Sequence, residues 1–192
     1  MHQLEPYDDW RNLYAAEEDE LSPFYEREYS EFQYTHHIYD HYIHPQWDSI
    51  GSPSLFIKLL FVDYDEGFCI IEMIGEWNDT LHNDIMVLKR EIADHMIYEG
   101  ISKFILIGEN VLNFHASDDL YYEEWSDDVS DKNGWICLLN FRDFVLHEMS
   151  QTGIDQYFAM GGTLNQFEWR TYRPLPLYQK IDQLLNRRFL TA

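Results

Sequence analysis

Basic residues are scarce in this sequence. Its 192 residues contain 13 Lys and Arg against 35 Asp and Glu, which gives a formal net charge of −22 at pH 7. A surface with that balance repels the phosphates of nucleic acids and the anionic lipids of an inner membrane leaflet. We therefore expect neither a nucleic acid nor a membrane as a partner.

Long apolar runs and cysteines are also scarce. No run of about eighteen uncharged apolar residues occurs, and residues Met1 to Pro6 show neither a basic start nor an apolar stretch. Cys69 and Cys137 each stand inside an apolar run, as small buried hydrophobic residues do. These absences predict a cytoplasmic protein with reduced thiols, which neither spans a membrane nor is secreted.

Apolar and aromatic residues are plentiful enough for one core. Hydrophobic residues make up 45% of the chain and aromatic residues 17%, more than a disordered polar chain carries. Two domains would each have to form a core from about a hundred residues or fewer, so one domain is expected. Residues 1–53 are acidic, rich in aromatics and without clear periodicity. We expect them to be an N-terminal extension that packs against a domain of residues 54–192.

Charge differs in sign between the two ends of the chain. Residues 1–50 contain twelve acids against Arg11 and Arg27, whereas residues 164–192 contain five bases against two acids. This asymmetry suggests that the basic C-terminal segment docks on acidic parts of the same fold, or of a second copy in a homodimer.

Apolar periodicity indicates the order of elements in the domain. Two β-rich runs, residues 55–62 and 68–74, flank a turn and predict a hairpin. Further strands are expected at residues 103–108 and 135–139 and over the short segment 154–160, and helices from Leu81 to Met96, from Ser117 to Trp125, from Phe141 to Met149 and from Leu177 to Arg188. A hairpin followed by crossover helices predicts an α/β fold, a mixed sheet of about four to five strands with helices packed on it.

Three stretches in this order have a familiar pattern: Gly75-Glu-Trp-Asn-Asp79, Phe104 to Leu120, and Val145 to Phe158. They look like a Gly-Glu-Leu-Asp turn into a first helix, a third strand with the phosphorylation loop beyond it, and a Leu-Glu-x-x-Gly-Leu-Asp-x-x-Phe helix ending. Residues 55–160 thereby resemble a STAS domain, the fold of bacterial anti-sigma-factor antagonists and of sulfate-transporter tails. The resemblance implies a non-enzymatic regulatory or scaffold module that binds a protein partner and needs no cofactor.

The resemblance also implies a partner surface. The family's Asp-Ser-Ser-Gly loop, whose serine a kinase phosphorylates, falls here on His115-Ala-Ser-Asp118. Phosphorylation of Ser117 is one interpretation; because Asp118 and Asp119 would repel a phosphate, a helix cap is the plainer one. The surface is expected at residues 76–79 and 114–125, with core packing as the alternative for some aromatics; its contact residues would be Glu76, Trp77, Ser117, Asp118, Tyr121, Tyr122 and Trp125.

A histidine cluster supports a second hypothesis. On a helix, His37, His41 and His44 would lie at i, i+4 and i+7 and could bind one metal ion. The neighbouring Tyr and Ile residues suit a strand equally, and there His44 would face away from the other two. The alternative function is therefore a metal-binding protein or enzyme that uses these histidines. Elsewhere no nucleophile motif occurs, and Glu72, Glu76 and Glu109 support no acid–base assignment.

Overall fold

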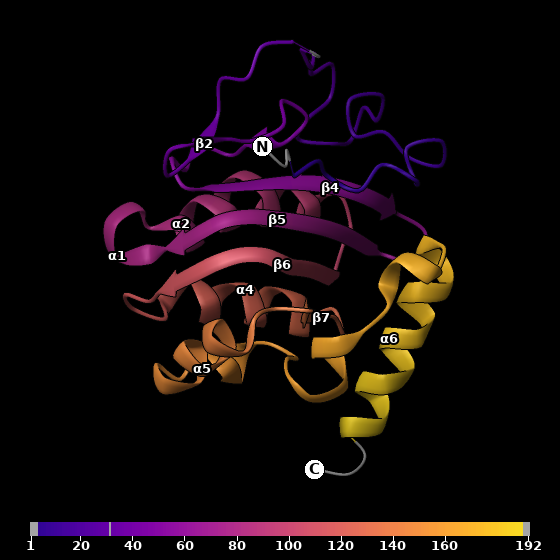
Figure 1. The fold of residues 1–192 in the computed structure, drawn as a ribbon. Coiled ribbons are helices and arrows are strands. Elements are labelled where there is room, and N and C mark those ends of the chain that lie inside the picture. The colour runs from indigo at the N-terminus through magenta and orange to yellow at the C-terminus, as the bar shows by residue number, and fades with distance from the viewer. Residues whose placement is uncertain (1–3, 31, 190–192) are drawn as a thin grey trace.

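The computed structural model describes residues 4–30 and 32–189. A five-stranded sheet of order β3-β4-β5-β6-β7 forms its centre (Figure 1). The first three strands pair antiparallel and the last three pair parallel. The strands are β3 (Asp48–Ser49), β4 (Leu55–Asp63), β5 (Phe68–Asn78), β6 (Lys103–His115) and β7 (Trp135–Leu139). The predicted α/β class, with an antiparallel hairpin inside a mixed sheet, is confirmed.

Helices and one small hairpin complete the fold. The helices are α1 (Asp79–His82), α2 (Asp84–Val87), α3 (Asp94–Tyr98), α4 (Leu120–Ser130), α5 (Asp143–Gln151) and α6 (Pro174–Phe189). A π-helical turn, η1 (Leu88–Ala93), joins α2 to α3, and 3-10 turns cover Ile154–Tyr157 (η2), Gly162–Gln166 (η3) and Trp169–Thr171 (η4). The strands β1 (His37–Ile38) and β2 (His41–Tyr42) pair with each other in a separate hairpin. None of the helices in the described ranges is both long and apolar enough to cross a bilayer.

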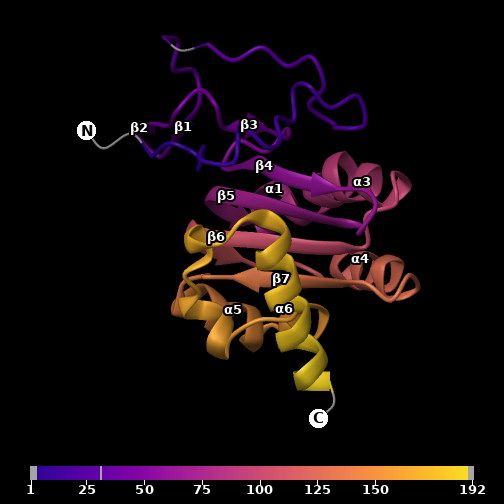
Figure 2. The ribbon, with the colours of Figure 1, turned by 90° about the vertical axis from the view of Figure 1, so that its right-hand side faces the viewer.

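The two faces of the sheet are covered by different parts of the chain. Alternation along β5 puts Ile71, Met73 and Trp77 in the core shared with α2 to α5, and puts Ile70 and Ile74 on the opposite face. Figure 2 shows α6 crossing that opposite face in front of β6 and β7, apart from α3 and α4. The N-terminal extension lies beyond β4 at the edge of the sheet (Figure 1) and packs on both faces. Trp10 and Trp47 join the side of α6 and the small hairpin, and Phe24 joins the core of the helices.

The extension packs against the domain, as its aromatic content predicts. Trp10, Phe24 and Trp47 are buried. Tyr7, Trp10 and Trp169 meet edge to face, with ring centroids 4.8 to 5.6 Å apart. The extension also supplies β3, so it shares the sheet with the residues that follow it.

Several elements differ from their predicted bounds. Strand β5 runs past Ile74 to Asn78, and β6 runs past Gly108 to His115. The helix expected from Leu81 is broken at Asn83, whose φ is 51°, and regular helix begins only at Asp84. Helix α4 runs past Trp125 to Ser130, because Val129 adds a further buried turn to its inner face. Residues 154–157 form a 3-10 turn, and one bridge, Cys137 to Ala159, stands where a short strand was expected.

Candidate functional site

The carboxyl ends of β5 and β6 lie side by side. Asn78 pairs with His115 at the end of the two strands, and α1 and α4 begin just beyond them. In open α/β sheets, ligands bind just outside the carboxyl ends of the strands, where the loops lead into the starts of helices. We call residues 76–82 and 115–121 the strand-end surface.

Hydrogen bonds fix the loops of this surface. The side chain of Asn78 accepts from the main-chain N–H of Leu81 at 3.0 Å and caps α1. The hydroxyl of Thr80 donates to the carbonyl of Ala116 at 2.9 Å and so ties α1 to the loop after β6. From the other side, the hydroxyl of Tyr157 donates to Asp119 at 2.7 Å. Loop and helix starts therefore form one ordered unit.

A buried carboxylate supports this surface from below. Asp79 accepts from the hydroxyl of Tyr122 at 2.5 Å, from the indole N–H of Trp77 at 3.1 Å and from the main-chain N–H of Ile85 at 2.8 Å. Burial raises the pKa of Asp79 to about 6, although the three hydrogen bonds oppose that rise. The carboxylate thus links the end of β5 to α2 and α4.

Three aromatics predicted as exposed contacts are part of the core. Trp77, Tyr122 and Trp125 are each 0% exposed, so their predicted exposure is wrong. Trp77 belongs to the β5 side chains that face the helices, and Tyr122 and Trp125 lie at i and i+3 on the inner face of α4. Trp125 packs edge to face on Phe104, with ring centroids 5.2 Å apart. Burying these large rings fixes α4 against the sheet.

The remaining predicted contacts stay accessible, and two further residues join them. Ser117 and Asp118 are exposed, and Glu76 and Tyr121 are half-buried. Leu81 is 74% exposed and lies outside the expected surface, and Leu120, 60% exposed, lies within the expected range 114–125 but is not among its named contact residues. The break at Asn83 takes Leu81 out of the helical stripe to which it was assigned. Leu120 could have been recognised, because it lies outside the Tyr122–Trp125–Val129 stripe.

Ser117 does not cap α4. The N-cap position is Asp119, and the side chain of Asp118 accepts from the main-chain N–H of Leu120 at 3.3 Å. The cap interpretation of Ser117 is therefore wrong. Its phosphorylation stays a prediction.

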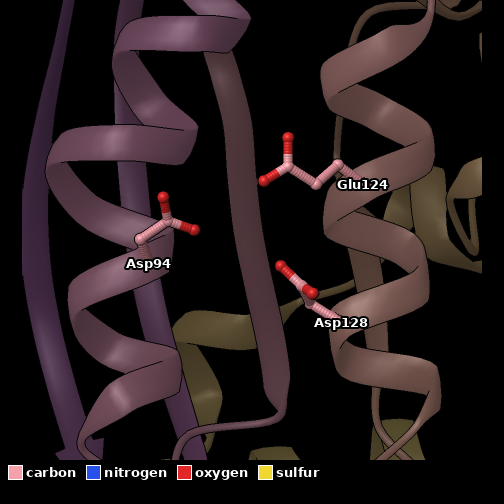
Figure 3. Close-up of side chains that lie close together, drawn as sticks. All are labelled: Asp94, Glu124 and Asp128. Atoms are coloured by element: carbon pink, nitrogen blue, oxygen red, sulfur yellow. The ribbon is translucent and has the colours of Figure 1, made fainter.

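Three carboxylates converge between the helices on the other side of α4. Figure 3 shows Asp94 of α3 facing Glu124 and Asp128 of α4 across the space between the two helices. Within residues 4–30 and 32–189, theirs is the one group of metal-ligating side chains close enough to hold an ion. The ammonium of Lys89 already lies among them, 2.8 Å from Asp128 and 3.5 Å from Glu124, and donates to Asp94.

Lys89 makes the three carboxylates part of a network of ion pairs. Its side chain is fully buried. Burial alone lowers its pKa, but hydrogen bonds to Asp128 and Asp94 outweigh that effect and raise the pKa above its ordinary value. Arg90 adds a second cation, donating to Glu124 at 2.6 and 2.8 Å and to Asp94 at 2.8 Å. The cluster joins η1 and α3 to α4.

The predicted histidine site does not form. The segment is the β1–β2 hairpin, not a helix, with His37 opposite Tyr42 and His41 opposite Ile38. His44 follows the hairpin, with its Nε2 3.7 Å from a carboxylate oxygen of Glu5. The metal hypothesis depends on a helix, in which residues at i, i+4 and i+7 share one face. Two short strands and a tight turn do not form that face. No group in the part of the chain that the structure describes joins these three histidines.

The acids Glu72 and Glu109 serve the opposite face of the sheet. Glu72 accepts from the main-chain N–H of Tyr7 at 2.8 Å, and Arg170 lies 2.7 Å from Glu109 and 3.8 Å from Glu72. Burial raises the pKa of Glu72 to about 7. Arg170 thus docks on acids of its own fold, in line with the predicted role of the basic C-terminal segment. Helix α6 packs through Leu177 and its apolar neighbours, and it also accepts hydrogen bonds from Trp135 to Asp182 at 3.1 Å and from Lys103 to Tyr178 at 2.6 Å.

Comparisons with known proteins give a likeness among solved structures. No protein-family model and no curated protein matches the sequence. Among solved structures, the chain is similar to a protein from Thermotoga maritima assigned as an anti-sigma factor antagonist, at 14% sequence identity and a TM-score of 0.41. The likeness covers 53% of this chain and 82% of that chain.

Proposed function

We propose that this protein is a non-enzymatic regulatory or scaffold module that binds a protein partner through the strand-end surface. One observation carries the proposal: Leu81 on α1 and Leu120 at the start of α4 are 74% and 60% exposed, and a hydrogen bond ties α1 to the loop that leads into α4. Leaving apolar area in water costs about 25 cal/mol per Å², and gathered exposed apolar side chains mark contact surfaces. Tyr121, half-buried beside Leu120, adds an aromatic contact residue.

Charge around the leucines defines the partner's chemistry. Asp118, Asp119 and Glu123 are exposed here, and no Lys or Arg occurs between Phe104 and Asp131. A partner with an apolar centre and a basic rim complements such a surface, and the opposite charges speed its approach. Association should therefore weaken as salt concentration rises.

Ser117 gives this surface a means of regulation. Its hydroxyl is exposed between the two helix starts. A phosphate would add about 1.5 to 2 negative charges next to Asp118 and Asp119 and would change the affinity for a basic partner. The proposal places the protein in the cytoplasm, in keeping with the buried positions of Cys69 and Cys137 in the core. Mass spectrometry of protein from its own host tests the modification.

Affinity capture with a matched pair of variants tests the proposed surface. The double variant Leu81→Asp, Leu120→Asp should lose a partner that the unchanged protein captures, because two carboxylates replace the apolar centre. Tyr98→Asp is the control, since Tyr98 is 87% exposed at the end of α3, beyond the amino end of β6. Light scattering separates a second copy of this chain from a different partner. Capture of the same protein in equal yield by both variants would refute the proposal.

A further inference from the structure

A pocket of about 320 Å³ lies between the β1–β2 hairpin and the end of the sheet. Ile74 of β5 and Asn110 and Leu112 of β6 form its floor, and Tyr39 and Ile43 stand on the hairpin side. Small-molecule sites in proteins occupy about 300–1,000 Å³ and are mainly apolar with a few polar groups. The pocket has that size and that character.

The topology explains why this part of the sheet is open. Strand β6 pairs with β7 only as far as Ile107, yet β6 continues to His115. On the same face, α6 covers Ile70 and Ile105 but does not reach Ile74, which packs with the hairpin residues instead. The hairpin therefore roofs a piece of sheet that no helix covers.

Tyr39 is held over this pocket in a strained conformation. Its φ is 52°, the left-handed region that a bulky residue rarely adopts and that hairpin turns usually fill with Gly, Asn or Asp. The side chain is 57% exposed, so packing in the core does not explain the strain. Its hydroxyl donates to the carboxylate of Glu76. Strain of this kind is kept where the position of a side chain serves a purpose.

Carboxylates border the pocket, and one histidine, His41, belongs to its lining. Glu76 accepts from the hydroxyl of Tyr39, and the exposed Asp40 and Glu5 each directly follow a residue of the lining in the sequence. No Lys or Arg belongs to the described lining. Arg142 donates to the main-chain carbonyl of Glu109 at 3.2 Å and stays outside it. An anionic ligand would meet repulsion here, whereas a cation would meet a carboxylate and aromatic rings.

We propose that this pocket binds a small organic cation, an ammonium group carried on an apolar body. The body would lie on Ile74, Leu112 and Ile43, and the ammonium would lie beside Glu76, against the ring of Tyr39. Cation–π attraction and the carboxylate act on the charge, and burial of the body supplies the apolar part of the affinity. The apolar lining lies on the opposite face of the sheet from the core beneath the strand-end surface, and Glu76 borders both sites. Titration of a small amine tests the pocket, whereas affinity capture with the leucine variants tests the strand-end surface.

Three probes of similar shape and different charge test the site. Phenethylamine, 2-phenylethanol and phenylacetate are titrated into the full chain, and binding is followed by protein NMR shifts. We expect the amine to bind saturably and to shift the NMR signals of the lining residues. The alcohol should bind roughly tenfold more weakly, a difference of about 1.4 kcal/mol, and the acid should not bind. Equal binding of all three, or no saturable binding of the amine, would overturn the proposal.

Two variants locate the interaction. Glu76→Gln keeps a hydrogen-bond acceptor for Tyr39 but removes the negative charge. It should weaken binding of the amine about tenfold and leave binding of the alcohol unchanged. Glu123→Gln on α4 is the control that removes the same charge elsewhere. Tyr39→Gly relieves the left-handed strain, so the chain should keep or gain stability while losing the amine. Unchanged binding of the amine to both variants would show that the pocket is not its site.

Discussion

The buried ammonium of Lys89 provides the sharpest test of the packing between η1, α3 and α4. The substitution Lys89→Met keeps an unbranched apolar chain of similar length and removes the charge. The three carboxylates then face one another without the ammonium. Among the described residues, Arg90 is the cation that remains, and it pairs with Asp94 and Glu124. Asp128 is left without the donor that now lies 2.8 Å away.

The expected loss is set by how well the carboxylates can rehydrate. Removing one partner of a fully buried ion pair costs about 3–5 kcal/mol. The carboxylate side chains are 35 to 43% exposed and can turn to water, so we expect a smaller loss, about 2 kcal/mol at pH 7. In a chain of this size that lowers the melting temperature by about 4–8 °C.

The pH dependence identifies the cause. Burial tends to raise the pKa of Asp94, but hydrogen bonds from Lys89 and Arg90 outweigh it and lower the pKa; Arg90 and then Lys89 lower that of Glu124. Carboxyl groups whose folded pKa is lowered stabilise the fold above their unfolded pKa, and that stability is lost as pH falls through the folded value. The deficit of Lys89→Met should therefore be full at pH 7 and should shrink below about pH 4.

Urea unfolding at pH 7 and pH 3.5 measures this deficit. Lys132→Met is the control, because exposed Lys132 donates only to the carbonyl of Ile97 among its described contacts. In Lys89→Met the carboxylate oxygens, within 4.8 Å of one another, should accept Ca²⁺, which at ten times its dissociation constant would restore about 1.4 kcal/mol. The reasoning fails if both variants lose equal stability at pH 7, or if the deficit of Lys89→Met is the same at both pH values.

Two further predictions concern the other buried carboxylates. Glu72 ionises in the folded protein only near pH 7 because burial raises its pKa, while the unfolded chain ionises near pH 4.5, so the wild type should lose about 3 kcal/mol between these values. Glu72→Gln should lack this loss; urea unfolding at pH 4.5 and 8 checks it, and parallel profiles would contradict it. Tyr122→Phe should cost about 1–3 kcal/mol in urea unfolding, because Asp79 keeps only two of its three donors, whereas Tyr121→Phe should cost under about 1 kcal/mol.

The sheet and its main helices could be predicted because local pattern and final packing agree in them. The stripe Ile85, Leu88, Ile92 and Met96 is buried as the 3.6-residue period requires. Trp77 could also have been placed in the core, since it continues the alternation of Ile71 and Met73. Its neighbours Gly75 and Asn78 are residue types typical of turns, and they favour a loop here, although β5 continues through both of them. A Cβ at Gly75 would lie 1.9 Å from the carbonyl of Ser54, so glycine serves a close strand contact there.

The rest depends on contacts between distant residues. No periodicity indicates that a π turn brings Lys89 inside, because the turn is stabilised by Asp128, on another helix. The histidine spacing is equally ambiguous, since strand and helix templates both fit until the turn at Tyr39 is known. The pocket beneath the hairpin follows from where β7 ends and where α6 stops, which are properties of the assembled sheet.

Tyr7 and Arg170, from the early and late parts of the sequence, meet at Glu72, and this affects how the chain folds during translation. Tyr7 contacts Glu72 through its main chain and Arg170 through its hydroxyl, across a separation of 163 residues. While the chain emerges from the ribosome, the N-terminal extension must wait for η4 and α6 before its face of the sheet is closed. Until then Ile70, Ile105 and Trp10 stay in reach of chaperones and of other nascent chains. The docking of η4 and α6 is therefore the closing step of folding, and a chain that lacks these two elements should be held by chaperones or degraded.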